Sequence, residues 1–139
     1  MNQQEANILT VEGLNVDYGK FHAVQNVSFN VLKGEIFGLL GPNGAGKTST
    51  LSAVEGLLKP QSGTIIVDGN NAAEKPLHAR ASLGVQLQST SFQPELHVIE
   101  VLQLYGGIYG LKLSKEQVLA LLRDINLEDQ AFKKFGQHA

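Results

Sequence analysis

The sequence predicts an α/β fold, with strands in the first half of the chain and helices in the second. Apolar side chains alternate with polar ones over residues 8–16 and 27–31, the period of half-buried strands, with Gly13 as an irregularity. Beyond residue 94 apolar side chains recur every three or four positions, as they do on one face of a helix. Within the first half, a glycine-rich segment at 41–48 joins an apolar run to a helical pattern, which is typical of α/β folds.

The elements around this glycine-rich segment can be placed in order. Residues 36–40 are apolar on both faces, which predicts a strand buried within a parallel sheet. Leucine and valine at helical spacing predict a helix over 47–58. A short strand is expected over 64–67, ended by a turn at 68–71, and a further strand over 83–87.

Two helices are expected in the second half. The first follows an apolar stripe over 98–109 and is weakened at its end by glycines. The second has a clear start, because Ser114 and Gln117 fit a capping box and Leu113 and Val118 fit the hydrophobic staple around it.

Composition bounds the class of protein. The chain has 139 residues, 42% of them apolar and 17% charged, which suits one globular domain. The net charge of −2 is spread along the chain without a basic cluster, so a nucleic-acid partner is not expected. Cysteine is absent, which excludes disulfides and thiolate metal sites. The polar start does not resemble a signal peptide and no apolar run could cross a bilayer, so membrane association would need a partner.

The segment Gly41 to Thr48 has the spacing G-x-x-x-x-G-K-[ST], which is that of a P-loop. Glycines let the backbone approach phosphates closely, and successive N–H groups form a nest for anions. The helix that begins near Lys47 adds the positive end of its dipole. Lys47 can reach the β- and γ-phosphates, and the Thr48 hydroxyl can coordinate Mg²⁺. The segment therefore predicts binding of a nucleoside triphosphate.

Residues 41–50 resemble the P-loop of the ABC transporter ATPases, and the resemblance extends from about residue 8 to residue 137. The segments that carry it are Asp17-Tyr18-Gly19, Val27-Ser28-Phe29, Gly63 to Gly69 and Leu83 to Gln88. Val54 to Leu57 and Leu83 to Ser89 look most similar to ATPases of bacterial drug and antibiotic exporters. The resemblance implies ATP and Mg²⁺ as ligands.

The resemblance also implies an incomplete P-loop NTPase fold with a three-layer core. The whole chain is then a single truncated ATP-binding domain. Residues 1–35 and 61–74 form an N-terminal antiparallel β subdomain, 36–60 and 75–93 belong to the P-loop core, and 94–139 begin an α-helical subdomain. A composition shift near 88–94 marks the internal boundary.

The resemblance gives roles to particular residues. Tyr18 matches the aromatic that stacks on adenine, although stacking alone does not select ATP over GTP. Val24 matches an aliphatic residue near the base and ribose. Gln88 matches the glutamine that contacts Mg²⁺ and the attacking water, so Lys47 and Gln88 are the expected catalytic residues and Thr48 and Gln88 the metal contacts. The expected nucleotide contacts are Tyr18, Val24, Gly41, Pro42, Asn43, Gly44, Ala45, Gly46, Lys47, Thr48 and Ser49.

Some assignments have alternatives. Gln86 or Gln93 could take the role of Gln88, which is favoured because it falls just past the predicted strand. His97 is expected to start a helix rather than to act in catalysis. The other histidines, with no acidic or metal-ligating constellation around them, are expected at the surface: His22, His78 and His138.

Hydrolysis in this family needs motifs that these residues do not contain. There is no apolar strand ending in Asp-Glu, no Leu-Ser-Gly-Gly-Gln signature and no downstream switch histidine. Residues 65–68 imitate the acidic strand, but Gly69 follows, so a turn is expected there. The chain is therefore expected to be the N-terminal part of a longer ATPase, to bind ATP without turning it over, and to leave the strand at 36–40 with an open apolar edge.

The resemblance implies partners and a place in the cell. A transmembrane transporter subunit and a second ATPase subunit are expected, at the cytoplasmic face of the plasma membrane. An alternative is a non-enzymatic module that occupies the dimer interface of a partner ATPase. A GTPase would need a guanine-reading Asn-Lys-x-Asp segment and a small-molecule kinase an arginine-rich lid, whereas Arg80 and Arg123 are the only arginines.

Overall fold

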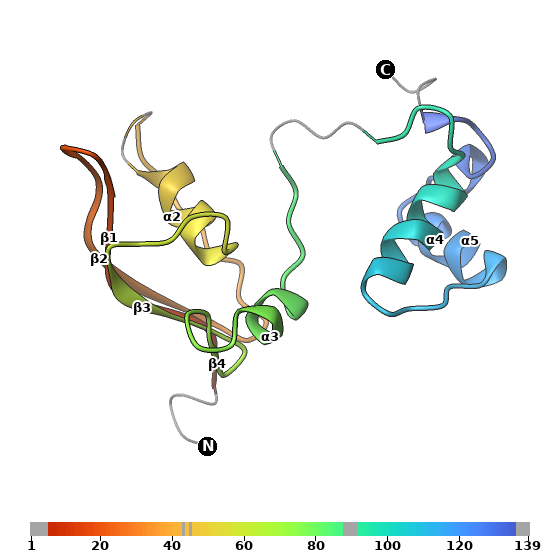
Figure 1. The fold of residues 1–139 in the computed structure, drawn as a ribbon. Helices are drawn as coiled ribbons and strands as arrows, with labels where there is room; N and C mark the ends of the chain where they lie inside the picture. Colours follow the sequence, from red (N-terminus) through yellow and green to blue (C-terminus); the bar gives the residue numbers. More distant parts are fainter. Residues whose placement is uncertain (1–5, 43, 45, 88–91, 136–139) are drawn as a thin grey trace. The chain divides into compact units, whose positions relative to one another are not determined.

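The computed structural model describes residues 6–42, 44, 46–87 and 92–135 (Figure 1). The chain divides into two compact units, one up to Val85 and one from Gln86. They are named the sheet unit and the helical unit here, and each is described by itself.

The sheet unit is built on one four-stranded antiparallel sheet with the order β2-β1-β3-β4. The strands are β1 (Asn7–Tyr18), β2 (Phe21–Leu32), β3 (Ser62–Val67) and β4 (Asn70–Asn71). The strands predicted from the alternation of apolar residues and the N-terminal antiparallel sheet implied by the family resemblance are both confirmed. The β1–β2 register shifts between Val11 and Leu14, where Gly13 lies. The turn predicted at residues 68–71 is also confirmed, because Asp68 and Gly69 connect β3 to β4.

Two helices of the sheet unit, α2 (Lys47–Val54) and α3 (Pro76–Ala81), share its apolar core. The core joins side chains of three strands to Ala53 and Val54 of α2 and Ala79 of α3. Its largest fully buried side chains are in the strands: Val11, Leu14, Val16 and Val67. Burying such side chains stabilises the unit by about 1.5–3 kcal/mol each, so α2 is fixed to the sheet by packing.

Three expectations for the sheet unit were wrong. The helix ends at Val54 rather than at residue 58, because Gly56 takes a left-handed φ of 76° that ends a helix readily. Residues 36–40 and 83–87 are not strands. Ile36 is 99% and Leu40 93% exposed, so the expected apolar strand edge at 36–40 is an irregular segment instead. A strand requires a hydrogen-bonded neighbour, and in the described part of the chain all sheet pairing belongs to the four antiparallel strands.

The helical unit contains α4 (Val98–Ile108), α5 (Lys115–Asp124) and the short 3₁₀ helix η1 (Glu128–Gln130). Ile99, Val118, Leu122 and Ala131 form its core. Both predicted helices are confirmed, and so is the capping box at the start of α5, where the Ser114 hydroxyl accepts a hydrogen bond from the backbone N–H of Gln117. No helix within the described ranges is both long and apolar enough to span a membrane.

His97 is the N-cap of α4, as expected. The carboxylate of Glu100 accepts a hydrogen bond from the backbone N–H of His97 at 2.7 Å and lies 2.9 Å from His97 Nδ1. The backbone bond and then the imidazole contact lower the pKa of Glu100 below its ordinary value of 4.5. Glu100 therefore caps α4 best in its ionised form.

This cap should make the stability of the helical unit depend on pH. A carboxylate with a lowered pKa stabilises the folded state above its ordinary pKa, and this contribution is lost as the pH falls through the folded value. We expect Glu100→Ala to melt at a lower temperature than the wild type at pH 7, and the difference to shrink below pH 4.5. Circular dichroism at 222 nm measures both. Glu95→Ala, at an exposed position before α4, is the control, and a pH-independent difference would contradict the role of the carboxylate.

Candidate functional site

The predicted phosphate loop leads directly into α2. Gly46 is the N-cap of this eight-residue helix, with a left-handed φ of 88°, and the first turn of α2 carries no acidic side chain. The free N–H groups and the dipole at this end of the helix therefore keep their attraction for an anion. Asn43 and Ala45 of the loop lie outside the described residues.

Gly46 also fixes where the loop lies against the sheet. A Cβ at this position would overlap with the backbone carbonyl oxygen of Ala23 in β2 and lie 3.2 Å from a methyl group of Val24. Only glycine fits both the backbone angle and the space. The start of α2 therefore packs directly on β2, and Val24, which is 3% exposed, forms part of the core below the loop.

Lys47 closes the loop on itself. Its Nζ donates a hydrogen bond to the backbone carbonyl of Gly41, the first residue of the loop. The ammonium group thus lies across the loop rather than away from it. A lysine at this position can exchange one carbonyl for phosphate oxygens without leaving the loop. Thr48 beside it is exposed at the helix start.

Tyr18 lies at the end of β1, where the chain turns into β2, and is 50% exposed. Its hydroxyl lies 3.1 Å from the Ser49 hydroxyl in the first turn of α2. One aromatic ring and the phosphate loop, which are far apart in the sequence, are therefore brought to the same end of α2. Ser49 provides the direct link between them.

Two contacts at this hairpin could not be foreseen from the sequence. His22 is exposed, as expected, and its Nδ1 lies 2.7 Å from the carboxylate of Asp17. The two residues face each other because Asp17 and His22 are paired across the hairpin. The Gln61 side chain makes two hydrogen bonds to the backbone of Asp17, a contact across 44 positions that no local pattern indicates.

Gln88 lies outside the described residues, and its alternatives Gln86 and Gln93 are both exposed. His78 is exposed on α3 and His138 is not described. Within the described ranges no cluster of three or more histidine or acidic side chains could hold a metal ion.

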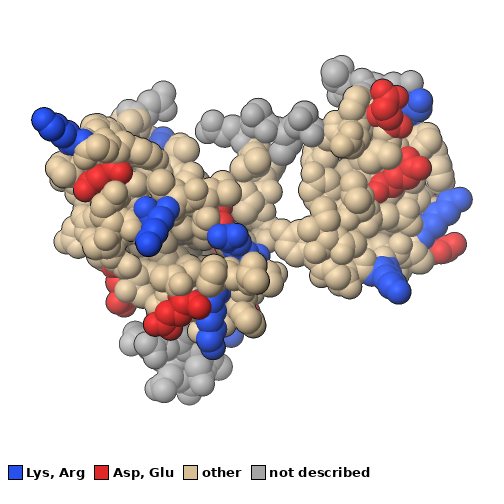
Figure 2. Space-filling view, in the orientation of Figure 1, with Lys and Arg blue, Asp and Glu red and all other residues tan. Residues whose placement is uncertain are grey.

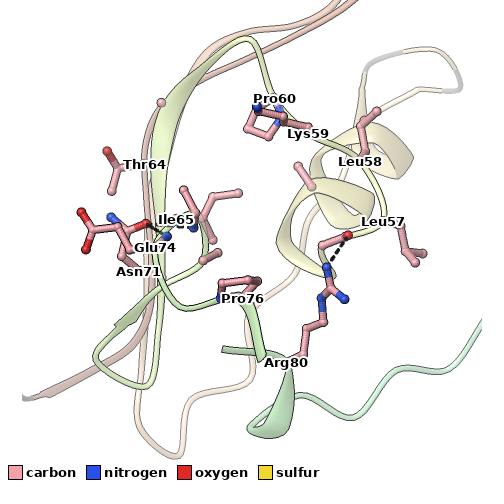
Figure 3. A pocket seen from close by; sticks show the side chains of 15 residues that line it. Leu57, Leu58, Lys59, Pro60, Thr64, Ile65, Asn71, Glu74, Pro76 and Arg80 are labelled. Atoms are coloured by element: carbon pink, nitrogen blue, oxygen red, sulfur yellow. Dashed lines mark hydrogen bonds between the residues drawn. The ribbon is translucent and has the colours of Figure 1, made fainter. Parts of the chain in front are cut away.

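A separate hollow of about 760 Å³ lies in the sheet unit, between the C-terminal end of α2, β3 and α3 (Figure 3). None of the predicted site residues lines it. Lys59, Glu74 and Arg80 give it both signs of charge, and the guanidinium of Arg80 donates a hydrogen bond to the Gly56 carbonyl across it at 3.2 Å. On the face shown in Figure 2, basic and acidic side chains are likewise interspersed within each unit. The ammonium group of Lys47 and the positive end of the α2 dipole lie together at the loop, whereas the hollow lies at the C-terminal end of α2.

Comparison with known proteins identifies the family. Residues 24–139 match the family described as ABC transporter. The chain is 40% identical over 126 residues to the Nod factor export ATP-binding protein I of Ralstonia nicotianae, covering 89% of this chain and 39% of that protein. It is 36% identical over 129 residues to the linearmycin resistance ATP-binding protein LnrL of Bacillus subtilis, covering 91% of this chain and 42% of that protein.

A solved structure, described as the ATP-binding subunit of an ABC transporter, superposes with a TM-score of 0.79 at 32% identity, covering 91% of this chain and 54% of the other. The α/β fold of the P-loop NTPases, expected from the sequence, is thereby confirmed. The chain spans about two fifths of the length of these two curated relatives. The chain belongs to the ABC transporter family.

The packing of Gly46 gives a test of the loop geometry that needs no ligand. Gly46→Ala adds both a strained φ, worth about 1–2 kcal/mol, and an overlap with Ala23, worth about 1–3 kcal/mol more. Gly44 has a similar φ of 85° but open space around it, so Gly44→Ala is the matched control. We expect urea unfolding to show the larger loss of free energy for Gly46→Ala. Equal losses would mean that the loop does not pack on β2.

Proposed function

We propose that this chain is the ATP-binding part of an ABC-type transporter that couples ATP binding and hydrolysis to export. The observation that supports this most strongly is that Lys47, the start of α2 and Tyr18 come together at one place. Binding a nucleoside triphosphate requires a cation and N–H donors for the phosphates and an aromatic face for the base. The described residues offer these side by side.

The phosphates would lie at the N-terminal end of α2. Backbone N–H groups from Gly44 to Thr48 would donate to the phosphate oxygens. The sequence motif assigns Gly41, Pro42 and Asn43 as further contacts of the nucleotide. Lys47 would exchange its bond to Gly41 for the β- and γ-phosphates. The ring of Tyr18 would stack on the adenine, with Val24 packed below the loop.

The metal would be held mainly by the nucleotide. Without a carboxylate cluster in the described ranges, Mg²⁺ would take oxygens from the phosphates and from the Thr48 hydroxyl, with Gln88 as a further contact. Mg²⁺ bound there would neutralise charge on the phosphates during their transfer. Lys47 would hold the same charge from the other side, and Gln88 would orient the water.

The proposed export direction and the proposed partners are inferred from the related proteins. The relatives compared are a Nod factor export protein and a linearmycin resistance protein. From their names we propose that the transporter exports a small molecule. Within the family, such ATP-binding subunits work as dimers with transmembrane subunits. We place this chain at the cytoplasmic face of the membrane in such a complex. Because these residues contain neither the acidic strand nor the signature segment, we propose that the chain alone binds ATP without turning it over.

Calorimetric titration with ATP, with and without Mg²⁺, tests the proposal. We expect Lys47→Ala to weaken ATP binding by roughly tenfold or more, because it removes a charge-assisted contact worth about 1.5–3 kcal/mol. Thr48→Ala should reduce the gain in affinity that Mg²⁺ gives, because it removes one of the two proposed protein contacts to the metal. Lys59→Ala, an exposed lysine beyond the far end of α2, is the control for charge. Wild-type protein that binds no ATP, or that loses as much affinity with Lys59→Ala as with Lys47→Ala, would refute the proposal.

A further inference from the structure

We infer that Gln61 is a positioning residue for the nucleobase, which it serves by fixing the backbone next to Tyr18. This inference rests on the proposed function and adds to it a residue outside the P-loop. The observation behind it is that the pairing of β1 with β3 stops before the end of β1. The strand β3 begins at Ser62, which pairs with Asn15 of β1. Asp17 and Tyr18 therefore extend beyond the end of their neighbour on this side.

The backbone cannot continue this pairing. Continuing the register of Asn15 and Ser62 by two residues would place Pro60 opposite Asp17. Proline has no N–H to donate, so a regular pair cannot form there. A strand end that is paired on one side only, here with β2, opens more readily than one paired on both sides. Tyr18, which carries the proposed base-stacking ring, follows Asp17 at this end.

The side chain of Gln61 takes the place of the missing peptide group. Its Oε1 accepts a hydrogen bond from the Asp17 N–H at 2.6 Å, and its Nε2 donates to the Asp17 carbonyl at 3.2 Å. The backbone N–H of Gln61 itself donates to the Asn15 carbonyl at 3.0 Å. A primary amide has the same donor and acceptor pair as a peptide. The antiparallel ladder is thus continued to Asp17 by a side chain.

Tyr18 is then held from two sides. Its backbone follows Asp17, which Gln61 fixes, and its hydroxyl contacts Ser49 at 3.1 Å. Ser49 lies in the first turn of α2, and Gln61 follows the segment that leaves the other end of the same helix. A ring held in place before the base arrives loses less conformational freedom on binding. Gln61 should therefore raise the affinity for the base and leave the affinity for the phosphates unchanged.

The test compares two probes, Mg-ATP and Mg-tripolyphosphate, by calorimetry on the whole chain. Gln61→Met keeps the side-chain volume but removes both hydrogen bonds to Asp17. We expect it to weaken ATP binding about three- to fivefold and to leave tripolyphosphate binding unchanged. In a Tyr18→Ala background the same substitution should have no effect on ATP. Gln25→Met, at an exposed glutamine on β2, is the matched control.

Amide hydrogen exchange provides a readout that needs no nucleotide. The Asp17 amide should exchange about fivefold faster in Gln61→Met, because its acceptor is gone. An unchanged Asp17 exchange rate would overturn the inference, and so would an equal loss of affinity for both probes or a persistent effect in Tyr18→Ala. If the wild type binds no ATP, the proposed function is wrong and so is any role in base binding. The exchange rate would then decide separately whether Gln61 holds the end of β1.

Discussion

The close approach of Gly46 to the carbonyl of Ala23 is the constraint on which the site depends. It leaves no room for a side chain between the phosphate loop and β2, so the loop lies directly on the sheet. The N-terminal end of α2 is thereby placed beside the hairpin formed by β1 and β2. Lys47 and Ser49 can then face the loop and Tyr18, respectively. Without the contact between Gly46 and Ala23, Lys47, Ser49 and Tyr18 would not be held together at one site.

The opposite end of α2 is tied to the same hairpin by a different interaction. The helix ends at Val54, and the following segment leads to Gln61 and β3. Packing of Ala53 and Val54 into the core fixes the helix along its length. Close packing of Gly46 holds the start of α2 against β2, and the hydrogen bonds of Gln61 hold the backbone next to Tyr18. Water competes for the hydrogen bonds of Gln61, which lie at the surface, so their net contribution to stability is modest.

The parts of the fold that the sequence predicted well are those decided by neighbouring residues. A capping box at Ser114, a glycine loop before a helix and a turn at Asp68 each depend on a few consecutive residues. Alternation was sufficient for β1 and β2 because their partner is the adjacent strand in the chain. The α/β class and the family followed from these local features.

The parts that failed depend on contacts between distant residues. An apolar run such as 36–40 indicates that its side chains favour burial, but it cannot indicate that a neighbouring strand is present. Ile36 and Leu40 are exposed, and none of the four paired strands of this unit includes them. In the same way, no spacing rule connects Gln61 to Asp17, since the contact follows from a proline that interrupts the ladder. Local sequence therefore accounts for the phosphate loop, whereas the placing of the aromatic ring depends on long-range pairing. On the inference drawn above, a change at Gln61, just before β3, alters base recognition while the P-loop motif stays intact.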